Sequence, residues 1–287
     1  AHNVMIGANV AKCHTTGDCN IFIGNEAGSH VSSSGGTGSG NIGLGCKSLT
    51  GLTSGSNNTA IGPNRPGCSI TSGSGNVVIG DDAAVRLTTA VNNVYMGSSV
   101  ATCRTSGNYN FAVGYEALQG CSTSSNNSGS SNIAIGLMAG RNTGTGSNNI
   151  SIGDKAGYCN TTGGDNVNVG RCSGFCNSTA SYNVHLGLCA GYCQTTANMN
   201  IAGGYKALLG SSTTSNNTGT YNVVFGAFAG CCFSTGSKNV AIGYNAMKSG
   251  VVTGTRNVAL GTLAGEDITS GTDNVFLGTY AGRNNTI

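Results

Sequence analysis

The residues of this sequence that could do covalent chemistry are its 13 cysteines. A thiolate can act as a nucleophile, bind a metal ion or pair with a second cysteine in a disulfide bond. We interpret the cysteines as disulfide-forming residues of an oxidising compartment. A column of small buried thiols is one alternative, and a zinc site at Cys13, His14 and Cys19 is another. The disulfide candidates are Cys103, Cys121, Cys159, Cys172, Cys176, Cys189, Cys193, Cys231 and Cys232.

Seven N-x-S/T sequons could accept N-linked glycans if the chain is secreted. Asn149 begins a repeated unit and is expected to be buried without a glycan. The other sequons fall in polar segments that are predicted to form turns. These glycosylation candidates are Asn57, Asn126, Asn160, Asn177, Asn216 and Asn284.

Other catalytic chemistry has little support in the sequence. The ten acidic residues are scattered, and the adjacent pairs 81–82 and 266–267 lie in predicted turns, where we interpret them as solvated. The four histidines share no repeated unit. Glycine-rich stretches lack the following helix that a phosphate site needs. We therefore expect no catalytic residue, no metal ion, no cofactor and no enzymatic activity.

The cysteines and sequons are positioned by an internal repeat, the feature that decides the fold of such a chain. The unit Asn-aliphatic-variable-aliphatic-Gly occurs sixteen times between Asn3 and Asn274, mostly at intervals of 17 residues. Three longer intervals begin at Asn20, Asn110 and Asn200, which are 90 residues apart. The spacing predicts one domain over residues 1–287 with a five-unit super-repeat.

Two aliphatic residues at alternate positions predict a short strand with one buried face. We expect the aliphatic pair to face the core and the variable residue between them to face solvent or a partner. An alanine seven residues after the asparagine suits a second strand over a core too thin for more than a methyl group. Seventeen residues hold two short strands and two turns. The predicted fold is therefore all-β, a parallel β-solenoid or β-roll of about sixteen 17-residue coils.

Equal positions in stacked coils lie about 4.8 Å apart. The repeated asparagines should then form a ladder of hydrogen bonds. The same spacing permits disulfide bonds between coils, in a column of residues 159, 176 and 193 and a second column of residues 172 and 189. Residues 103 and 121 also fall in successive coils. The within-coil pairs 172–176 and 189–193 remain open as alternatives. The predicted ladder includes Asn132, Asn149, Asn166, Asn183, Asn200, Asn222 and Asn239.

Composition excludes several classes of protein. Glycine, at 49 residues, has no period of three, which excludes collagen. A net charge of +3 with only 8% charged residues argues against nucleic-acid binding. The chain has no apolar run of about 18 residues, so we expect no membrane insertion.

The segments NVAIGYNAM, NVALGTLAG and NVFLGTYAG, which begin at Asn239, Asn257 and Asn274, resemble a known repeat. They are similar to the N-x-x-I-G-x-x-A-G repeats of phage and bacterial tail-fibre-like proteins and to the head repeats of trimeric autotransporter adhesins. The resemblance implies a β-roll or β-solenoid, often trimeric, that gives reach and adhesion at a cell or virion surface.

We therefore expect a structural, fibre-forming protein that is extracellular or lies on a cell or virion surface. Its partner is expected to be itself, through lateral homo-oligomerisation, including trimers, and through end-to-end stacking, because regular units begin and end the sequence without a cap. The alternative is an adhesin or receptor-binding shaft with surface glycans as partners. Ice binding by threonine pairs such as Thr161–Thr162 is a weaker alternative. The contacts of the adhesin would be Tyr109, Tyr115, Tyr182, Tyr205 and Tyr221.

Overall fold

The structure is a computed structural model that describes residues 2–29, 35–120, 127–210 and 217–286. It comprises two compact units, Ala1–Ser147 and Asn148–Ile287. The predicted disulfide partner Cys121 and the sequons Asn126 and Asn216 lie outside the described residues.

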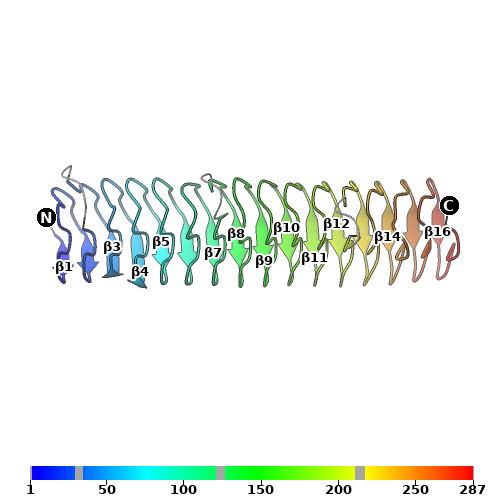
Figure 1. The fold of residues 1–287 in the computed structure, drawn as a ribbon, viewed down its shortest axis with the longest axis horizontal. Helices are drawn as coiled ribbons and strands as arrows, with labels where there is room; N and C mark the ends of the chain where they lie inside the picture. Colours follow the sequence, from blue (N-terminus) through cyan, green and yellow to red (C-terminus); the bar gives the residue numbers. More distant parts are fainter. Residues whose placement is uncertain (1, 30–34, 121–126, 211–216, 287) are drawn as a thin grey trace. The chain divides into compact units, whose positions relative to one another are not determined.

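Both units are all-β, and each is a parallel β-solenoid, as the repeat predicts. Their strands lie side by side in chain order (Figure 1). The strands described in the first unit are β1 (Val4–Ile6), β2 (Ile21–Ile23), β3 (Ile42–Cys46), β4 (Thr59–Asn64), β5 (Val77–Ile79), β6 (Val94–Met96), β7 (Phe111–Val113) and β8 (Ile133–Ile135). Those described in the second unit are β9 (Ile150–Ile152), β10 (Val167–Val169), β11 (Val184–Leu186), β12 (Ile201–Gly203), β13 (Val223–Phe225), β14 (Val240–Ile242), β15 (Val258–Leu260) and β16 (Val275–Leu277).

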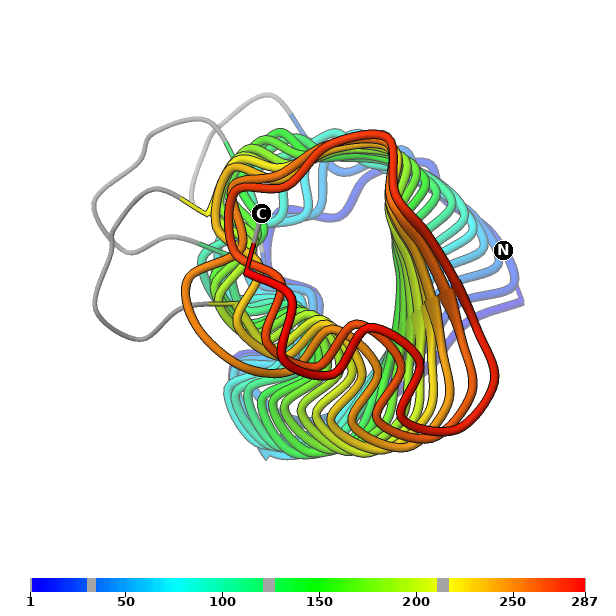
Figure 2. The same ribbon diagram turned by 90° about the vertical axis from the view of Figure 1, so that its right-hand side faces the viewer.

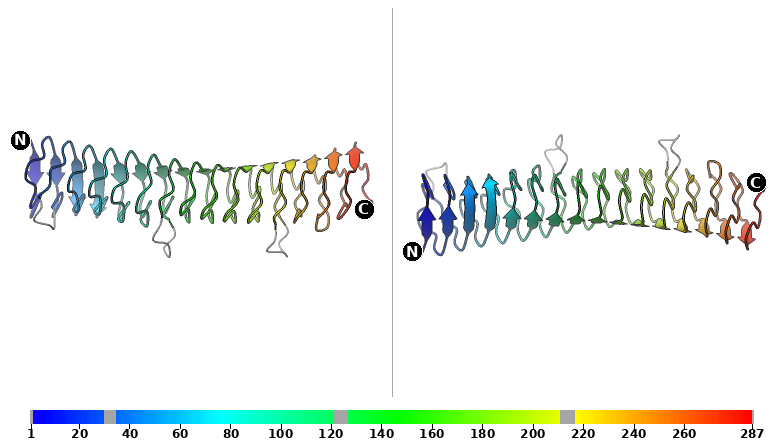
Figure 3. Two further views of the ribbon diagram at one scale, coloured as in Figure 1. Left: turned by 90° about the horizontal axis from the view of Figure 1, so that it is seen from above. Right: turned by 90° about the horizontal axis from the view of Figure 1, so that it is seen from below.

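The register between strands follows the 17-residue repeat. Val4 of β1 pairs with Ile21 of β2, and Val167 of β10 pairs with Val184 of β11. Each strand therefore lies directly above the equivalent strand of the next coil, and the strands of a unit follow one another along one side (Figure 3). This arrangement confirms the predicted solenoid and its coil length.

The strands face the opposite way from the prediction. Their middle residues, such as Ala60, Ala134 and Ala241, are completely buried. The flanking aliphatic residues, such as Ile135 and Leu186, are 37% and 40% exposed. The expectation that the aliphatic pair fills the core was therefore wrong, because the ladder asparagine two residues before the middle residue is buried and residues two apart lie on the same face of a strand.

The segment around the alanine that follows the ladder asparagine by seven residues forms a turn, where the sequence predicts a second strand. Around the buried Ala117, Glu116 and Leu118 have positive φ values of 52° and 49°, which are incompatible with a β-strand. Their N–H groups still bond to neighbouring coils, Glu116 to the Ser98 carbonyl and Leu118 to the Ala139 carbonyl. In the coils nearest the viewer in Figure 2, one straight side carries the strand and the remaining sides bend repeatedly. The described coils thus have one strand each and stack through turn-to-turn hydrogen bonds elsewhere.

Coils approach each other closely at the glycine that ends each strand. Gly226 has φ +130°, and a Cβ there would lie 2.4 Å from the carbonyl oxygen of Gly243. No real Cβ tolerates such a contact with backbone. Glycine at this position is therefore required by both its backbone conformation and the stacking distance.

The interior changes character along the second unit. In its first three coils the buried middle residues are Ser151, Asn168 and His185, and the opposing core position holds Asn160 and Asn177. Later coils have an apolar core that includes residues 224, 233, 252, 268 and 276. The polar interior of the first three coils, called the polar core here, leaves several side-chain atoms without a hydrogen-bond partner, namely Asn160 Oδ1, Asn168 Nδ2, Asn177 Oδ1 and His185 Nε2.

Candidate interaction face

The outward side chains of the strands form a candidate interaction surface. The first and third residues of each strand point away from the interior, so each unit carries two adjacent columns of half-exposed apolar side chains. We call these columns the aliphatic face. In the second unit Gly203 is the position that lacks a side chain. The most exposed members of that unit's face are Leu186, Ile201, Phe225, Ile242, Leu260, Val275 and Leu277.

A ladder of asparagines holds the strands of the face in register. Asn183 donates its backbone N–H and its Nδ2 to Asn166 Oδ1 at 3.0 and 3.1 Å. Its Nδ2 also donates to the Ala197 carbonyl at 2.9 Å. Each asparagine thus fixes the start of its own strand against the next coil. The backbone N–H donates to the preceding ladder Oδ1 at Asn20, Asn41, Asn58, Asn76, Asn93, Asn110, Asn132, Asn166, Asn183, Asn200, Asn222, Asn239, Asn257 and Asn274.

All seven predicted ladder residues are buried. Asn132 and Asn149 direct Nδ2 at the carbonyls of Gly146 and Gly163, at 2.9 Å in each case. Because a buried amide must be hydrogen-bonded, these contacts explain why the position is always asparagine. Asn149 is buried as expected for a sequon that carries no glycan.

Exposed tyrosines flank the aliphatic face. Tyr109, Tyr182 and Tyr221 stand two residues before a strand, each with φ near +60°, while Tyr115 and Tyr205 stand two residues after one. All five are 40% exposed or more. The left-handed backbone conformation of Tyr109, Tyr182 and Tyr221 is costly for a residue with a Cβ. The five predicted contact residues therefore lie beside the ends of the strands.

The described disulfide candidates lie in turn segments. Cys231 is buried, while Cys103, Cys159, Cys172, Cys176, Cys189, Cys193 and Cys232 are partly exposed, and the described cysteines are thiols in the structure. Cys176 is hydrogen-bonded to Cys193, and Cys172 to Cys189, in both cases between successive coils. The Sγ atoms of the adjacent Cys231 and Cys232 lie 3.4 Å apart.

Two predicted glycosylation sites are contradicted by burial. Asn160 and Asn177 point into the polar core with almost no exposed surface, so a glycan on either side chain would have no room. Asn57 and Asn284 are exposed. The prediction treated residues 160 and 177 as turn residues. The apolar Leu52 and Leu87 at the same position of other coils were the available signal that this position faces inward.

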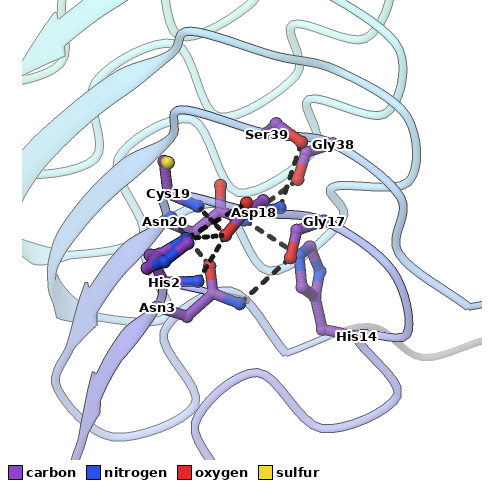
Figure 4. A network of polar contacts seen from close by, with 9 residues as sticks. All are labelled: His2, Asn3, His14, Gly17, Asp18, Cys19, Asn20, Gly38 and Ser39. Atoms are coloured by element: carbon purple, nitrogen blue, oxygen red, sulfur yellow. Dashed lines mark hydrogen bonds and ion pairs between the residues drawn. The ribbon is translucent and has the colours of Figure 1, made fainter.

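A polar network at the start of the first unit brings Asp18 together with His2 and Cys19 (Figure 4). The backbone N–H groups of His2 and Cys19 donate to the Asp18 carboxylate and lower its pKa to about 2. His14, the middle residue of the zinc site that the sequence offered as an alternative, instead accepts a hydrogen bond at Nε2 from Asn20 Nδ2 at 3.2 Å. His2 and Cys19 are exposed and Asp18 is partly buried; the ligand atoms of the three residues lie close enough for a cation, and we assign no metal to them.

Within the four described stretches of the chain, no helix combines the length and apolar character needed to cross a bilayer. Comparison with protein-family models, with curated proteins and with solved structures found no match.

Proposed function

We propose that this protein is a structural, self-associating solenoid of an extracellular, cell-surface or virion-surface assembly, in which the aliphatic face packs against a second copy of the chain. The observation that carries the proposal is the outward orientation of the aliphatic pairs. A solenoid that needed only to be soluble would place polar residues there, as an antiparallel sheet with one solvated face does.

The size of the face supports this partner. A half-exposed aliphatic side chain leaves roughly 50 Å² of apolar surface in water. Over the strands of one unit the patch exceeds the ~300–600 Å² that is usual for the largest patch on a monomer. It approaches the ~800 Å² that each partner contributes to a stable interface.

The distance at which side chains repeat along the aliphatic face also favours a second copy of the chain as the partner. Val167 pairs directly with Val184, so the apolar columns repeat once per coil at the strand spacing of about 4.8 Å. A copy of the same chain presents side chains at the same interval, so every coil makes the same contact. Lateral association of this kind yields a dimer, a trimer or a bundle, and end-to-end stacking would extend it into a fibre.

The test is the mass of the assembly in solution. Leu186→Lys combined with Ile242→Lys places two charges on the aliphatic face without altering a buried residue, and we expect the protein to become monomeric in sedimentation and light-scattering measurements. Thr235→Lys, at an exposed turn outside the face, should leave the mass of the assembly unchanged. A wild-type protein that is monomeric at high concentration would overturn the proposal.

The exposed tyrosines favour an adhesin or receptor-binding shaft as the second candidate. Tyrosine is enriched in binding surfaces because its ring is apolar and its hydroxyl is polar. Replacing Tyr182 and Tyr221 by serine should abolish cell or glycan binding while leaving self-association intact. Electron microscopy separates the candidates, since long filaments or bundles support the structural role and short discrete rods support the adhesin.

The partly buried Thr161 uses its hydroxyl for a hydrogen bond between coils, which argues against ice binding. Thr161 Oγ1 donates to the Ser178 carbonyl at 2.9 Å, and Ser178 Oγ donates to the Thr195 carbonyl at 3.2 Å. Hydroxyls used in this way stabilise the stack and are less available to water. A thermal-hysteresis assay should therefore give no activity.

A further inference from the structure

We propose that two disulfide bonds, Cys172–Cys189 and Cys176–Cys193, join the coil of β10 to the coil of β11. The two links would lie on either side of the stacked rings of Phe175 and Tyr192. They do not depend on association between copies, so they can be tested separately from the function proposed above.

The spacing of these coils suits a disulfide. The rings of Phe175 and Tyr192, which immediately precede Cys176 and Cys193, stack with centroids 4.9 Å apart and planes 7° apart. The backbone N–H of Cys176 donates to the Tyr192 carbonyl at 2.9 Å. The Cα atoms of equivalent cysteines in the two coils are therefore separated by about one strand spacing, ~4.8 Å. This distance lies within the range of about 4.4–6.8 Å that a disulfide bond permits between Cα atoms.

The stacking of successive coils places equivalent cysteines opposite each other, which favours between-coil pairs over the within-coil pairs 172–176 and 189–193. The coil of Cys159 stacks on that of Cys176 in the same way. The side chain of Cys176 interacts with that of Cys193, and Cys189 with Cys172, and these contacts select the two proposed pairs.

The adjacent pair Cys231–Cys232 is not part of the proposal although its Sγ atoms lie 3.4 Å apart. Neighbouring residues have Cα atoms about 3.8 Å apart across a trans peptide, which is shorter than the disulfide window. Cys231 instead directs its Sγ at the Lys248 carbonyl at 3.4 Å.

One thiol of the cluster is set up to react first. The hydrogen bond from Cys176 lowers the pKa of Cys193 to about 7, so a large part of Cys193 is thiolate at neutral pH. The same bond raises the pKa of Cys176, which stays protonated as the donor. A surface cavity of about 390 Å³ opens beside Cys193, with Arg171 and Lys206 in its wall. An anionic small-molecule disulfide of the glutathione class can approach there, because the two cations offset its charge.

The reaction is a thiol–disulfide exchange. The Cys193 thiolate attacks one sulfur of the small disulfide, forming a mixed disulfide and releasing one small thiolate. Cys176 then loses its proton to solvent and attacks the Cys193 sulfur, which releases the second small thiolate. Two protein thiols are oxidised and one small disulfide is reduced. Cys172 and Cys189 react with a second equivalent in the same way.

Peptide mapping tests the connectivity. The folded protein is equilibrated with oxidised glutathione, remaining thiols are blocked with N-ethylmaleimide, and the chain is digested with trypsin and chymotrypsin. Cleavage after Arg171, and after the aromatic residues 158, 175, 182 and 192, places Cys159, Cys172, Cys176, Cys189 and Cys193 in five separate peptides. We expect two cross-linked species, one joining the peptides of residues 172 and 189 and one joining those of residues 176 and 193.

Single variants assign each link. Cys189→Ser should free Cys172 for blocking and leave the second link intact, and Cys193→Ser should do the reverse. Cys68→Ser is the control, because Cys68 lies in the first unit and directs its Sγ at the Val85 carbonyl, so both links should persist. Links 172–176, 189–193 or 159–176 would overturn the proposal. Complete blocking of all five thiols after the glutathione treatment would overturn it as well.

Discussion

Asn166 Oδ1 accepts two hydrogen bonds from Asn183 of the next coil, one from the backbone N–H and one from Nδ2. Both residues are buried, so water does not compete for these hydrogen bonds, which couple the two coils. The same relationship recurs along both units and is the polar counterpart of the aliphatic face.

Replacing Asn183 by alanine removes Nδ2 and Oδ1, so the Ala197 carbonyl and the backbone N–H of Asn200 lose these partners, while Asn166 Oδ1 keeps the backbone N–H of residue 183. Because each unsatisfied buried group costs about 1–3 kcal/mol, we expect the free energy of unfolding in urea to fall by about 3 kcal/mol. Asn284→Ala, at an exposed position, is the matched control and should change stability by less than about 0.5 kcal/mol. Equal losses in the two variants would contradict a ladder that stabilises the fold.

Replacing Gly226 by alanine tests the close approach between coils. A Cβ there would meet the Gly243 carbonyl oxygen at 2.4 Å, whereas a Cβ at Gly278, with φ +112°, meets nothing within 4 Å. Both substitutions strain the backbone, but only Gly226→Ala adds a clash. We expect Gly226→Ala to lower the thermal midpoint more than Gly278→Ala, by the equivalent of about 1–3 kcal/mol. Similar midpoints would show that coils can move apart at this position.

Acid should destabilise the protein through His185. Burial lowers the pKa of His185 to about 4, below the unfolded value of about 6.5. The unfolded state therefore binds the proton first, and stability falls as the pH drops from about 6.5 to about 4. The loss amounts to about 3 kcal/mol at most. Urea unfolding at pH 7, 5.5 and 4 measures it.

The matched variant for the acid test is His185→Gln, which keeps a polar side chain and removes the titration. It should flatten the dependence of stability on pH between 6.5 and 4. Ser173 and Asn168, which contact His185, do not titrate in this range. An unchanged profile in His185→Gln would assign the acid sensitivity to another group.

Alkylation of the reduced protein should single out Cys193. With its pKa lowered to about 7 by the hydrogen bond from Cys176, its rate of reaction with iodoacetamide should rise with a midpoint near pH 7. Cys176→Ala removes the donor and should move that midpoint toward the ordinary thiol value of about 8.5. The rate is followed by the mass of the peptide that begins at Cys193. A midpoint unaffected by Cys176→Ala would contradict the assigned contact.

The coil length and the position of every strand could be predicted from the asparagine-to-glycine unit, because a period of two within a period of 17 leaves few folds. Which face of each strand points inward could not be predicted, because an alternating pattern alone does not say which of its two faces is buried. The alanines at positions such as 60, 112 and 241 were a partial signal, since Phe22, Tyr95 and Phe276 occupy the same buried position in other strands. The turn around the alanine seven residues after the asparagine was missed, because nothing in the residue types of Glu116 or Leu118 indicates a positive φ.

The function of the aliphatic face depends on that inversion. Sequence reasoning had assigned Ile152 and Leu186 to the core and looked for contacts among the tyrosines, so it missed the aliphatic face. Burial of Asn160 and Asn177 follows from the same geometry, since the column that holds them is apolar in other coils.

The polar core of β9–β11 has a mechanical consequence. Coils that enclose Ser151, Asn168 and His185 gain little from the hydrophobic effect, while the coils after them enclose Val224, Phe233 and neighbouring apolar side chains. Under tension along the chain, the second unit should unfold first at the coils of β9–β11 and lengthen there. A fibre built from this protein would then extend at a defined place while its other coils stay folded.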